Sequence, residues 1–132
     1  MSERKTILQI DDDDYTLDLL ELFLYNEYEL LTARNGFEGL KTAEQNQPDL
    51  IITDIMMPVM DGIRFFNELR KRESTGSIPV IAVTSFVEQF TVRSLKNMGF
   101  DGVISKPLRR ESLVDTVKSI LGEPREDREN EE

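Results

Sequence analysis

The sequence predicts an α/β fold in which helices cover both faces of a five-stranded parallel sheet. Short apolar runs, most of them rich in β-branched residues, alternate five times with amphipathic segments of helical length. Such alternation is typical of right-handed β-α-β units, because each strand returns to the same sheet through a crossover helix. The runs LIIT and VIAV have almost no polar interruption, as expected of strands covered on both faces. We therefore expect a doubly wound (βα)5 domain.

The expected strands are the apolar runs themselves. They span residues 6–10 (TILQI), 28–33 (YELLTA), 50–53 (LIIT), 80–84 (VIAVT) and 102–105 (GVIS). The segments between them carry apolar residues at i, i+3 and i+4 spacing, which places these residues on one face of a helix. In the first and last helices they are Leu17, Leu20 and Leu24, and Leu113, Val117, Ile120 and Leu121.

Length, charge and the missing residue types narrow the possible functions. A chain of 132 residues fits one domain with a real core. Its 26 acidic and 16 basic residues give a formal net charge of −10, which argues against a nucleic-acid backbone or an anionic membrane as the main partner. The chain has no cysteine and no histidine, so zinc sites, disulfides, thiol nucleophiles and Ser-His-Asp chemistry are excluded.

The two ends of the chain are polar. The opening MSERKTILQI has no apolar run of signal-peptide length, and no segment approaches the ~18 apolar residues of a membrane span. We therefore expect a soluble cytoplasmic protein with one domain over residues 1–122. The last ten residues, 123–132 (EPREDRENEE), contain six acids and two arginines, and we expect them to form a disordered acidic tail.

Chemically reactive side chains follow four of the five expected strands. They are Asp11 to Asp14, Asp54, Thr84 with Ser85, and Lys106 with Pro107. In parallel sheets of this kind, sites form at the carboxyl ends of the strands, so we expect these residues to converge. Carboxylates, a hydroxyl and an amine in one place suit a hard cation together with an anionic group.

The four consecutive aspartates need stabilising partners. Two carboxylates about 5 Å apart repel by about 3 kcal/mol at an effective dielectric near 20. Asp11 and Asp12 come first after the strand, and we assign them to a ligand role. Asp13 and Asp14 precede a helix, where carboxylates commonly accept from the free N–H groups, so we assign them to helix capping or to the solvated surface.

Four segments give the chain a resemblance to the receiver domain of response regulators in two-component signalling, over about residues 4–121. They are IDD (10–12), PDLIITDIMMPVMDG (48–62), PVIAVTS (79–85) and ISKP (104–107). The resemblance implies a flavodoxin-like fold with strand order 2-1-3-4-5. It implies that Asp54 is the phosphoacceptor, and that Thr84 and Lys106 contact the phosphoryl oxygens.

The same resemblance implies a Mg²⁺ site. Asp12, Asp54 and the backbone carbonyl of Met56 would hold the ion, and Asp11 would bind it through water or support the other ligands. This agrees with the preference of Mg²⁺ for oxygen ligands and with the need of phosphoryl transfer for positioning and charge neutralisation. The implied role is a signalling phosphoacceptor, not an enzyme that turns over a separate substrate.

The partners follow from the lack of histidine. The chain cannot itself supply a phosphohistidine, so the donor is expected to be a histidine kinase, a histidine phosphotransfer protein or a small phosphodonor. The output would be phosphorylation-dependent protein binding or onward relay of the phosphoryl group. A stand-alone regulator, a relay intermediate and a receiver excised from a larger hybrid kinase all stay open, as do the target and the oligomeric state.

The resemblance is incomplete at the position three before Lys106. Receivers often carry an aromatic residue there that moves with the hydroxyl residue, but this chain has Val103, so we do not expect that switch. We expect the readout to run through Thr84 and the apolar residues Phe86, Val87 and Phe90. Met56 and Phe86 are bulky at the positions that influence the attacking water, which predicts slow self-dephosphorylation that Met56→Asn with Phe86→Glu would speed.

A small Mg²⁺-dependent phosphatase similar to the haloacid dehalogenase superfamily is the alternative. Residues 12–16 (DDDYT) match its D-x-D-x-T motif, with Asp12 as the nucleophile. The later acidic motif of that superfamily has no counterpart after Lys106, and the segment 48–62 would go unexplained. A phosphate-independent interaction module is a further alternative.

Overall fold

Five strands and five helices alternate in the described residues, 4–85 and 91–123, of the computed structural model. The strands are β1 (Thr6–Ile10), β2 (Glu29–Ala33), β3 (Leu50–Asp54), β4 (Val80–Thr84) and β5 (Gly102–Ser105). The helices are α1 (Asp14–Leu24), α2 (Gly36–Asn46), α3 (Gly62–Lys71), α4 (Val92–Met98) and α5 (Arg110–Leu121).

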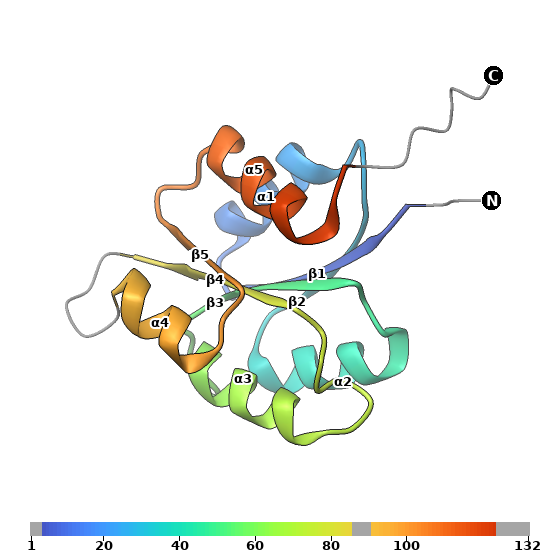
Figure 1. Cartoon of the computed structure of the whole chain (residues 1–132), viewed down its shortest axis with the longest axis vertical. Helices are drawn as coiled ribbons and strands as arrows, with labels where there is room; N and C mark the ends of the chain where they lie inside the picture. The colour runs from blue at the N-terminus through green and yellow to red at the C-terminus, as the bar shows by residue number, and fades with distance from the viewer. Residues whose placement is uncertain (1–3, 86–90, 124–132) are drawn as a thin grey trace.

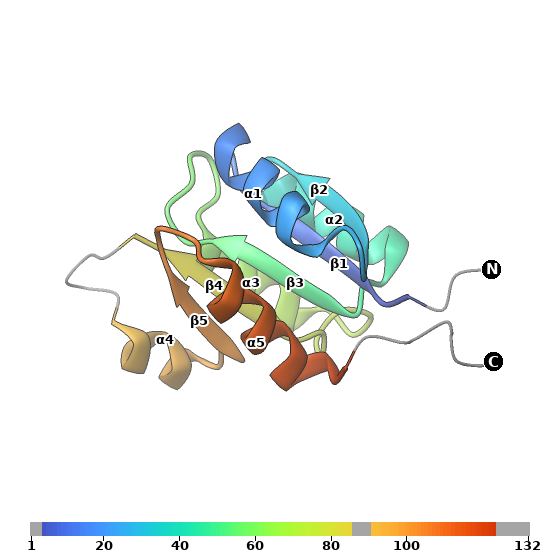
Figure 2. The same cartoon turned by 90° about the horizontal axis from the view of Figure 1, so that it is seen from above.

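The strands form one parallel sheet in the order β2-β1-β3-β4-β5. Helices α1 and α5 lie on one face, and α2, α3 and α4 lie on the other (Figure 1). Figure 2 shows the same layers from above, with α5 in front of the sheet. The expected fold class and strand order 2-1-3-4-5 are confirmed.

Two strand boundaries differ from the sequence prediction by one residue. The strand expected at 28–33 begins at Glu29, because the N–H of Tyr28 still bonds to the carbonyl of Leu24 at the end of α1, at 3.2 Å. The strand expected at 50–53 continues to Asp54. Asp54 is therefore held by the ladder and is not a free turn residue.

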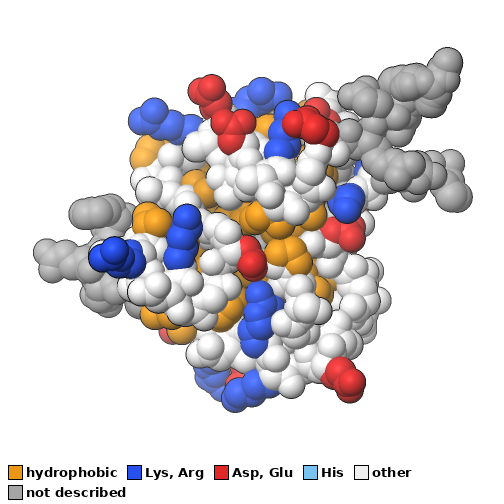
Figure 3. Space-filling model, viewed as in Figure 1, with side chains coloured by type: hydrophobic (Ala, Val, Ile, Leu, Met, Phe, Trp, Pro, Cys, Tyr) orange, Lys and Arg blue, Asp and Glu red, His pale blue; other side chains and the backbone are white. Residues whose placement is uncertain are grey.

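The core lies in two apolar layers, one on each side of the sheet. Every residue of β3 and β4 is buried, as the uninterrupted apolar runs predicted. The expected inner face of α1 is buried, and on α5 Leu113 and Val117 are buried while Ile120 and Leu121 are partly buried. In Figure 3, hydrophobic side chains show between the helices on the viewed face, with charged side chains around them.

Polar side chains fix the start of four helices. Asp13, Asn35, Asp61 and Thr91 each accept a hydrogen bond from the backbone N–H three residues later, at 2.8–3.1 Å. Such caps satisfy N–H groups that have no partner within the helix. The capping role expected of Asp13 is confirmed, while Asp14 lies exposed in the first turn of α1.

Some sequence predictions lie outside the described residues. Phe86, Val87 and Phe90 belong to the undescribed segment 86–90, and residues 124–132 contain most of the expected acidic tail. Glu123 is described, and its carboxylate lies 3.5 Å from the ammonium of Lys118 on α5. None of the helices in the described residues is long and apolar enough to cross a lipid bilayer.

The connection from β3 to α3 contains a strained backbone turn. The N–H of Met60 bonds to the carbonyl of Pro58 at 2.8 Å, and Val59 between them has φ +72°. A bond over two residues around a positive φ is typical of a classic γ-turn, which is rare and unfavourable for a β-branched residue. The loop beside Asp54 is thus held in a conformation that glycine would adopt more easily.

We expect Val59→Gly to raise the free energy of unfolding by about 1 kcal/mol, because it relieves this strain and Val59 is exposed. Glycine also adds entropy to the unfolded chain, which keeps the gain small. Chemical denaturation of both proteins measures the difference. A variant less stable than the wild type would contradict the prediction.

Tyr28 predicts an alkaline loss of stability. Burial, with smaller contributions from Glu27 and Glu123, raises the pKa of its phenol to about 12. Between pH 10 and 12 the unfolded chain has lost this proton while the folded chain keeps it, so rising pH favours unfolding, by up to about 1.4 kcal/mol for each pH unit. Tyr28→Phe should remove this part of the pH dependence, as measured by urea unfolding of both proteins from pH 8 to 12.

At pH 7 we expect Tyr28→Phe to be neutral or slightly stabilising. The buried phenol oxygen has no hydrogen-bond partner among the described residues, so its removal leaves no other group unpaired. Parallel stability curves for the two proteins above pH 10 would show that this phenol does not remain protonated in the fold.

Candidate functional site

Four charged side chains meet where β1, β3 and β5 end. Asp11 and Asp12 follow β1, Asp54 is the last residue of β3, and Lys106 follows β5. This is the edge of the sheet from which β4 runs into the grey segment in Figure 1. The sheet order brings these residues together although the sequence separates them widely.

The amine and carboxylates are within ion-pair distance. The ammonium of Lys106 lies 3.4 Å from Oδ1 of Asp54 and 3.6 Å from Oδ2 of Asp11. One carboxylate oxygen from each of Asp11, Asp12 and Asp54 lies within 4.8 Å of the other two. Asp11 and Asp54 are buried, at 1% and 5% exposure, whereas Asp12 is exposed.

The buried carboxylates have shifted protonation equilibria. Burial, followed by the nearby charge of Asp11, raises the pKa of Asp54 to about 6, and Lys106 partly offsets this rise. Burial also raises the pKa of Asp11. Burial by itself would lower the pKa of Lys106, but the two carboxylates outweigh it and raise that pKa. The cluster holds more negative charge than one ammonium neutralises.

Local backbone contacts hold the two acid-bearing segments in place. The N–H of Asp13 donates to Oδ1 of Asp11 at 2.9 Å. Beyond β3, the N–H of Gly62 donates to the carbonyl of Ile55 at 2.8 Å. A Cβ at position 62 would lie 2.3 Å from the carbonyl oxygen of Asp54, so only glycine allows α3 to begin this close to the strand end.

Thr84 and Met56 follow the same strand ends, and in the described part of the chain neither side chain hydrogen-bonds to the charged side chains of the cluster. Thr84 is the buried last residue of β4, its hydroxyl donates to the carbonyl of Ser85 at 2.8 Å, and its own carbonyl accepts from the N–H of Lys106 at 2.8 Å. Met56 follows Asp54 by two residues, and its side chain is 53% exposed. Val103 on β5 is partly buried against the core layer that α2, α3 and α4 cover.

The donor set fits a small, hard cation. Mg²⁺ prefers oxygen ligands, commonly takes one or two carboxylates, and keeps several waters. The three close carboxylate oxygens meet the first preference, and the exposure of Asp12 leaves the cluster open to water on one side. A divalent cation would offset the excess negative charge, which adds to the larger effect of burial in raising the pKa of Asp54.

Sequence reasoning missed Arg34, which directly follows β2. Its guanidinium pairs with the carboxylate of Asp14 and donates to the backbone carbonyl of Asp12 at 3.3 Å. No motif in the sequence marks this residue, because its partners lie 20 and 22 positions earlier in the chain. The contact exists only because β1 and β2 are neighbours in the sheet.

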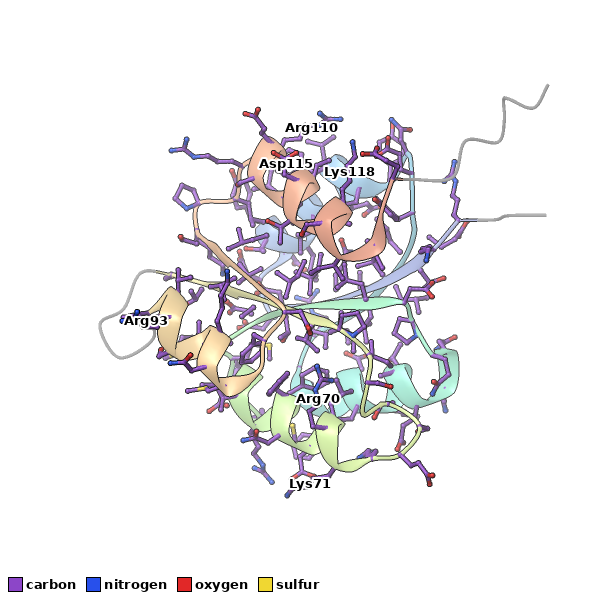
Figure 4. All side chains as sticks on the ribbon, in the orientation of Figure 1. Arg70, Lys71, Arg93, Arg110, Asp115 and Lys118 are labelled. Carbon is purple, nitrogen blue, oxygen red and sulfur yellow. The ribbon has the colours of Figure 1, made fainter. Side chains whose placement is uncertain are left out.

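Charged side chains of both signs lie on α4 and α5, which cover opposite faces of the sheet. Figure 4 shows Arg93 on α4, and Arg110, Asp115 and Lys118 on α5. Directly beside Lys106, a hollow of about 240 Å³ opens between α1 and the segment after β5. Its lining residues are Asp13, Tyr15, Thr16, Leu19, Lys106, Pro107 and Leu108. The peptide bond between Lys106 and Pro107 is cis.

Comparison with known proteins gives a consistent match. A family model for the response regulator receiver domain matches residues 7–118. The polar-differentiation response regulator DivK of Brucella anthropi is 32% identical over 120 residues, which cover 90% of this chain and 98% of the relative. DivK of Brucella ovis is also 32% identical over 120 residues, with the same coverage.

Solved structures agree with this match. A putative response regulator from Chloroflexus aurantiacus has a TM-score of 0.84 and 30% identity, over 92% of this chain and all of that one. The chemotaxis response regulator CheY4 of Vibrio cholerae has a TM-score of 0.80 and 28% identity, over 89% of this chain and 98% of that one. This chain therefore belongs to the family of response regulator receiver domains.

Proposed function

We propose that this chain is a signalling phosphoacceptor that takes a phosphoryl group from a phosphohistidine onto Asp54. The observation that carries the proposal is a carboxylate at the end of a buried strand, with an ammonium 3.4 Å from its Oδ1 and two further carboxylates beside it. The donor would be a histidine kinase or a histidine phosphotransfer protein. Family membership supports the same role.

Transfer would make one bond and break one. A carboxylate oxygen of Asp54 attacks the phosphorus, while the bond from phosphorus to the donor's imidazole nitrogen breaks and its electron pair returns to the ring. Lys106 already lies beside Asp54, so its ammonium would be close enough to pair with an oxygen of the transferred phosphoryl group. The side chains contribute mainly positioning and charge neutralisation, which is what phosphoryl transfer requires.

A divalent cation, Mg²⁺, would be held by Asp12, Asp54 and the backbone carbonyl of Met56, with Asp11 acting through water or supporting these ligands. Bound there, the ion would neutralise carboxylate and phosphoryl charge. The three close carboxylate oxygens support this assignment. Without such a cation the cluster would repel an incoming phosphoryl group.

Thr84 would carry the signal away from the site. Its hydroxyl donates to the carbonyl of Ser85, so it must leave that partner to reach a phosphoryl oxygen. Such a turn would move the start of the connection to α4. We propose that phosphorylation is read there without the aromatic switch, because position 103 holds a valine. The output is then binding of another protein or onward transfer.

The alternative of a haloacid-dehalogenase-like phosphatase is not favoured. The receiver model spans residues 7–118 and accounts for the segment around Asp54. Asp12, the nucleophile that this alternative requires, is exposed and has no ion pair with Lys106 among the described contacts.

We expect incubation with acetyl phosphate and Mg²⁺ to add one phosphoryl group to the wild type and none to Asp54→Asn. The amide removes the nucleophilic oxygen while keeping the shape of the side chain. Intact-mass spectrometry measures the addition, and hydroxylamine should reverse it because the product is an acyl phosphate.

Asp49→Asn is a matched control, because it removes one carboxylate at the other end of β3, where Asp49 accepts from the N–H of Thr6. It should be phosphorylated like the wild type. If neither the wild type nor the control reacts, a cognate kinase is the next donor to test. Addition of a phosphoryl group to Asp54→Asn would show that another residue is the nucleophile, and would favour the alternative in which Asp12 has that role.

We expect Met56→Asn to shorten the lifetime of the phosphorylated protein severalfold. Met56 is an apolar, half-exposed side chain two residues after the acceptor, where an amide could hold an attacking water. The decay of phosphorylated protein after removal of the donor measures the rate. Adding Phe86→Glu should speed it further, and equal decay in all three proteins would refute the assignment.

A further inference from the structure

We propose that Arg34 is a positioning residue that holds Asp12 ready for the divalent cation. The inference rests on the proposed function, because it concerns the same metal site. Arg34 would act through the backbone of Asp12 and would not contact the ion itself.

The guanidinium of Arg34 bridges two points of the segment between β1 and α1. Nη1 pairs with the carboxylate of Asp14, and Nη2 donates to the carbonyl of Asp12 at 3.3 Å. The planar guanidinium presents several N–H donors in a fixed geometry, which suits a contact to two acceptors at once. Asp12 lies between the anchored carboxylate of Asp14 and the strand end.

The base of the Arg34 side chain is also fixed. The N–H of Asp11 donates to the carbonyl of Ala33 at 3.1 Å, so the ends of β1 and β2 lie side by side. The N–H of Arg34 donates to Oε1 of Glu38 on α2 at 2.7 Å. The guanidinium therefore connects a rigid strand end to the acid-bearing segment.

Asp12 is the carboxylate that most needs such support. Lys106 pairs with Asp11 and Asp54, and Asp11 also accepts from the N–H of Asp13. Among the described residues, the carboxylate of Asp12 has no hydrogen bond or ion pair, and the side chain is exposed. Its position is set by its backbone, and Arg34 holds the carbonyl of that backbone.

Arg34 has two effects of opposite sign on cation binding. Its charge lies near Asp12 and disfavours a second cation by Coulomb repulsion, whereas its contacts keep Asp12 in place. Because Arg34 and Asp14 are both largely exposed, solvent screens the charge effect more than the geometric one. We therefore infer that positioning dominates and that loss of Arg34 weakens binding.

The test is titration of the unphosphorylated full chain with MgCl2, followed by the amide shifts of residues 11–14 and 54–56 in NMR spectra. We expect the Kd for Mg²⁺ to rise about tenfold in Arg34→Ala, the lower end of the effects seen for residues that orient metal ligands. Arg34→Lys should show most of this rise, because one ammonium keeps the charge but cannot span both acceptors.

Lys41→Ala is the matched control, because it removes one positive charge from an exposed position on α2, and no ion pair involves Lys41 in the described residues. Its Kd should stay close to that of the wild type. In addition, hydrogen exchange at the amide of Asp13, which donates to Oδ1 of Asp11, should speed up in Mg²⁺-free Arg34 variants and not in the control. A general loss of stability would change amides throughout the sheet instead.

Four outcomes would overturn the inference. A lower Kd in Arg34→Ala would show that the charge of Arg34 dominates over positioning. A Kd in Arg34→Lys equal to that of the wild type would show that the second contact, from Nη2 to the carbonyl of Asp12, is not needed for Mg²⁺ binding. Equal Kd values in all proteins would leave Arg34 as a surface ion pair. If the wild type itself shows no Mg²⁺-dependent shifts, the metal site of the proposed function fails, and this inference fails with it.

Discussion

The burial of two carboxylates beside one ammonium is the constraint on which the site depends. Asp11 and Asp54 are almost fully buried at adjacent strand ends, and Lys106 lies within 3.6 Å of both. Buried charge is strongly unfavourable unless it is paired, so this cluster exists only where the fold supplies partners. One amine against three acids leaves negative charge uncompensated. In the proposed function, that imbalance would favour a bound cation, and the cation would offset the charge of a phosphoryl group.

The parallel sheet produces this arrangement through its strand order, without unusual backbone geometry in the strands. β1, β3 and β4 are adjacent and point the same way, and β5 follows as the edge strand, so the residues after each strand share one edge. The helices on both faces bury the strands, and Asp11 and Asp54 at the strand ends are buried as well. Helix caps such as Asp13 and Asp61 begin α1 and α3 directly beside the site. The same short connections therefore carry the reactive groups and start the packing helices.

The three acids have different surroundings, and these differences suit different roles. Asp54 is held by the strand ladder and has a raised pKa from burial and from Asp11. Asp11 is anchored on both sides, by Lys106 and by the N–H of Asp13. Asp12 is exposed, and its backbone carbonyl accepts a hydrogen bond from Arg34, which lies outside the cluster. In the proposed function, these surroundings suit a fixed phosphoacceptor, a buried supporting acid and an accessible metal ligand.

The sequence by itself determined the fold class, the elements and the residues that gather at the strand ends. The spacing of apolar residues distinguishes strands from helices, and a parallel sheet brings the carboxyl ends of its strands together. Asp11, Asp12, Asp54 and Lys106 could therefore be predicted as site residues from the sequence. The one-residue differences at β2 and β3 arose because backbone hydrogen bonds, not side-chain type, set where a strand begins and ends.

The tertiary structure decided what depends on neighbours across the sheet. The run TILQI gives no sign that Gln9 is fully buried without a described hydrogen-bond partner, since that follows from the central place of β1. The direction of the Thr84 hydroxyl toward Ser85 is a local choice of rotamer that no motif specifies. The contact of Arg34 with Asp12 needs β2 beside β1, and a pairing between residues 22 positions apart appears only once the strands are placed.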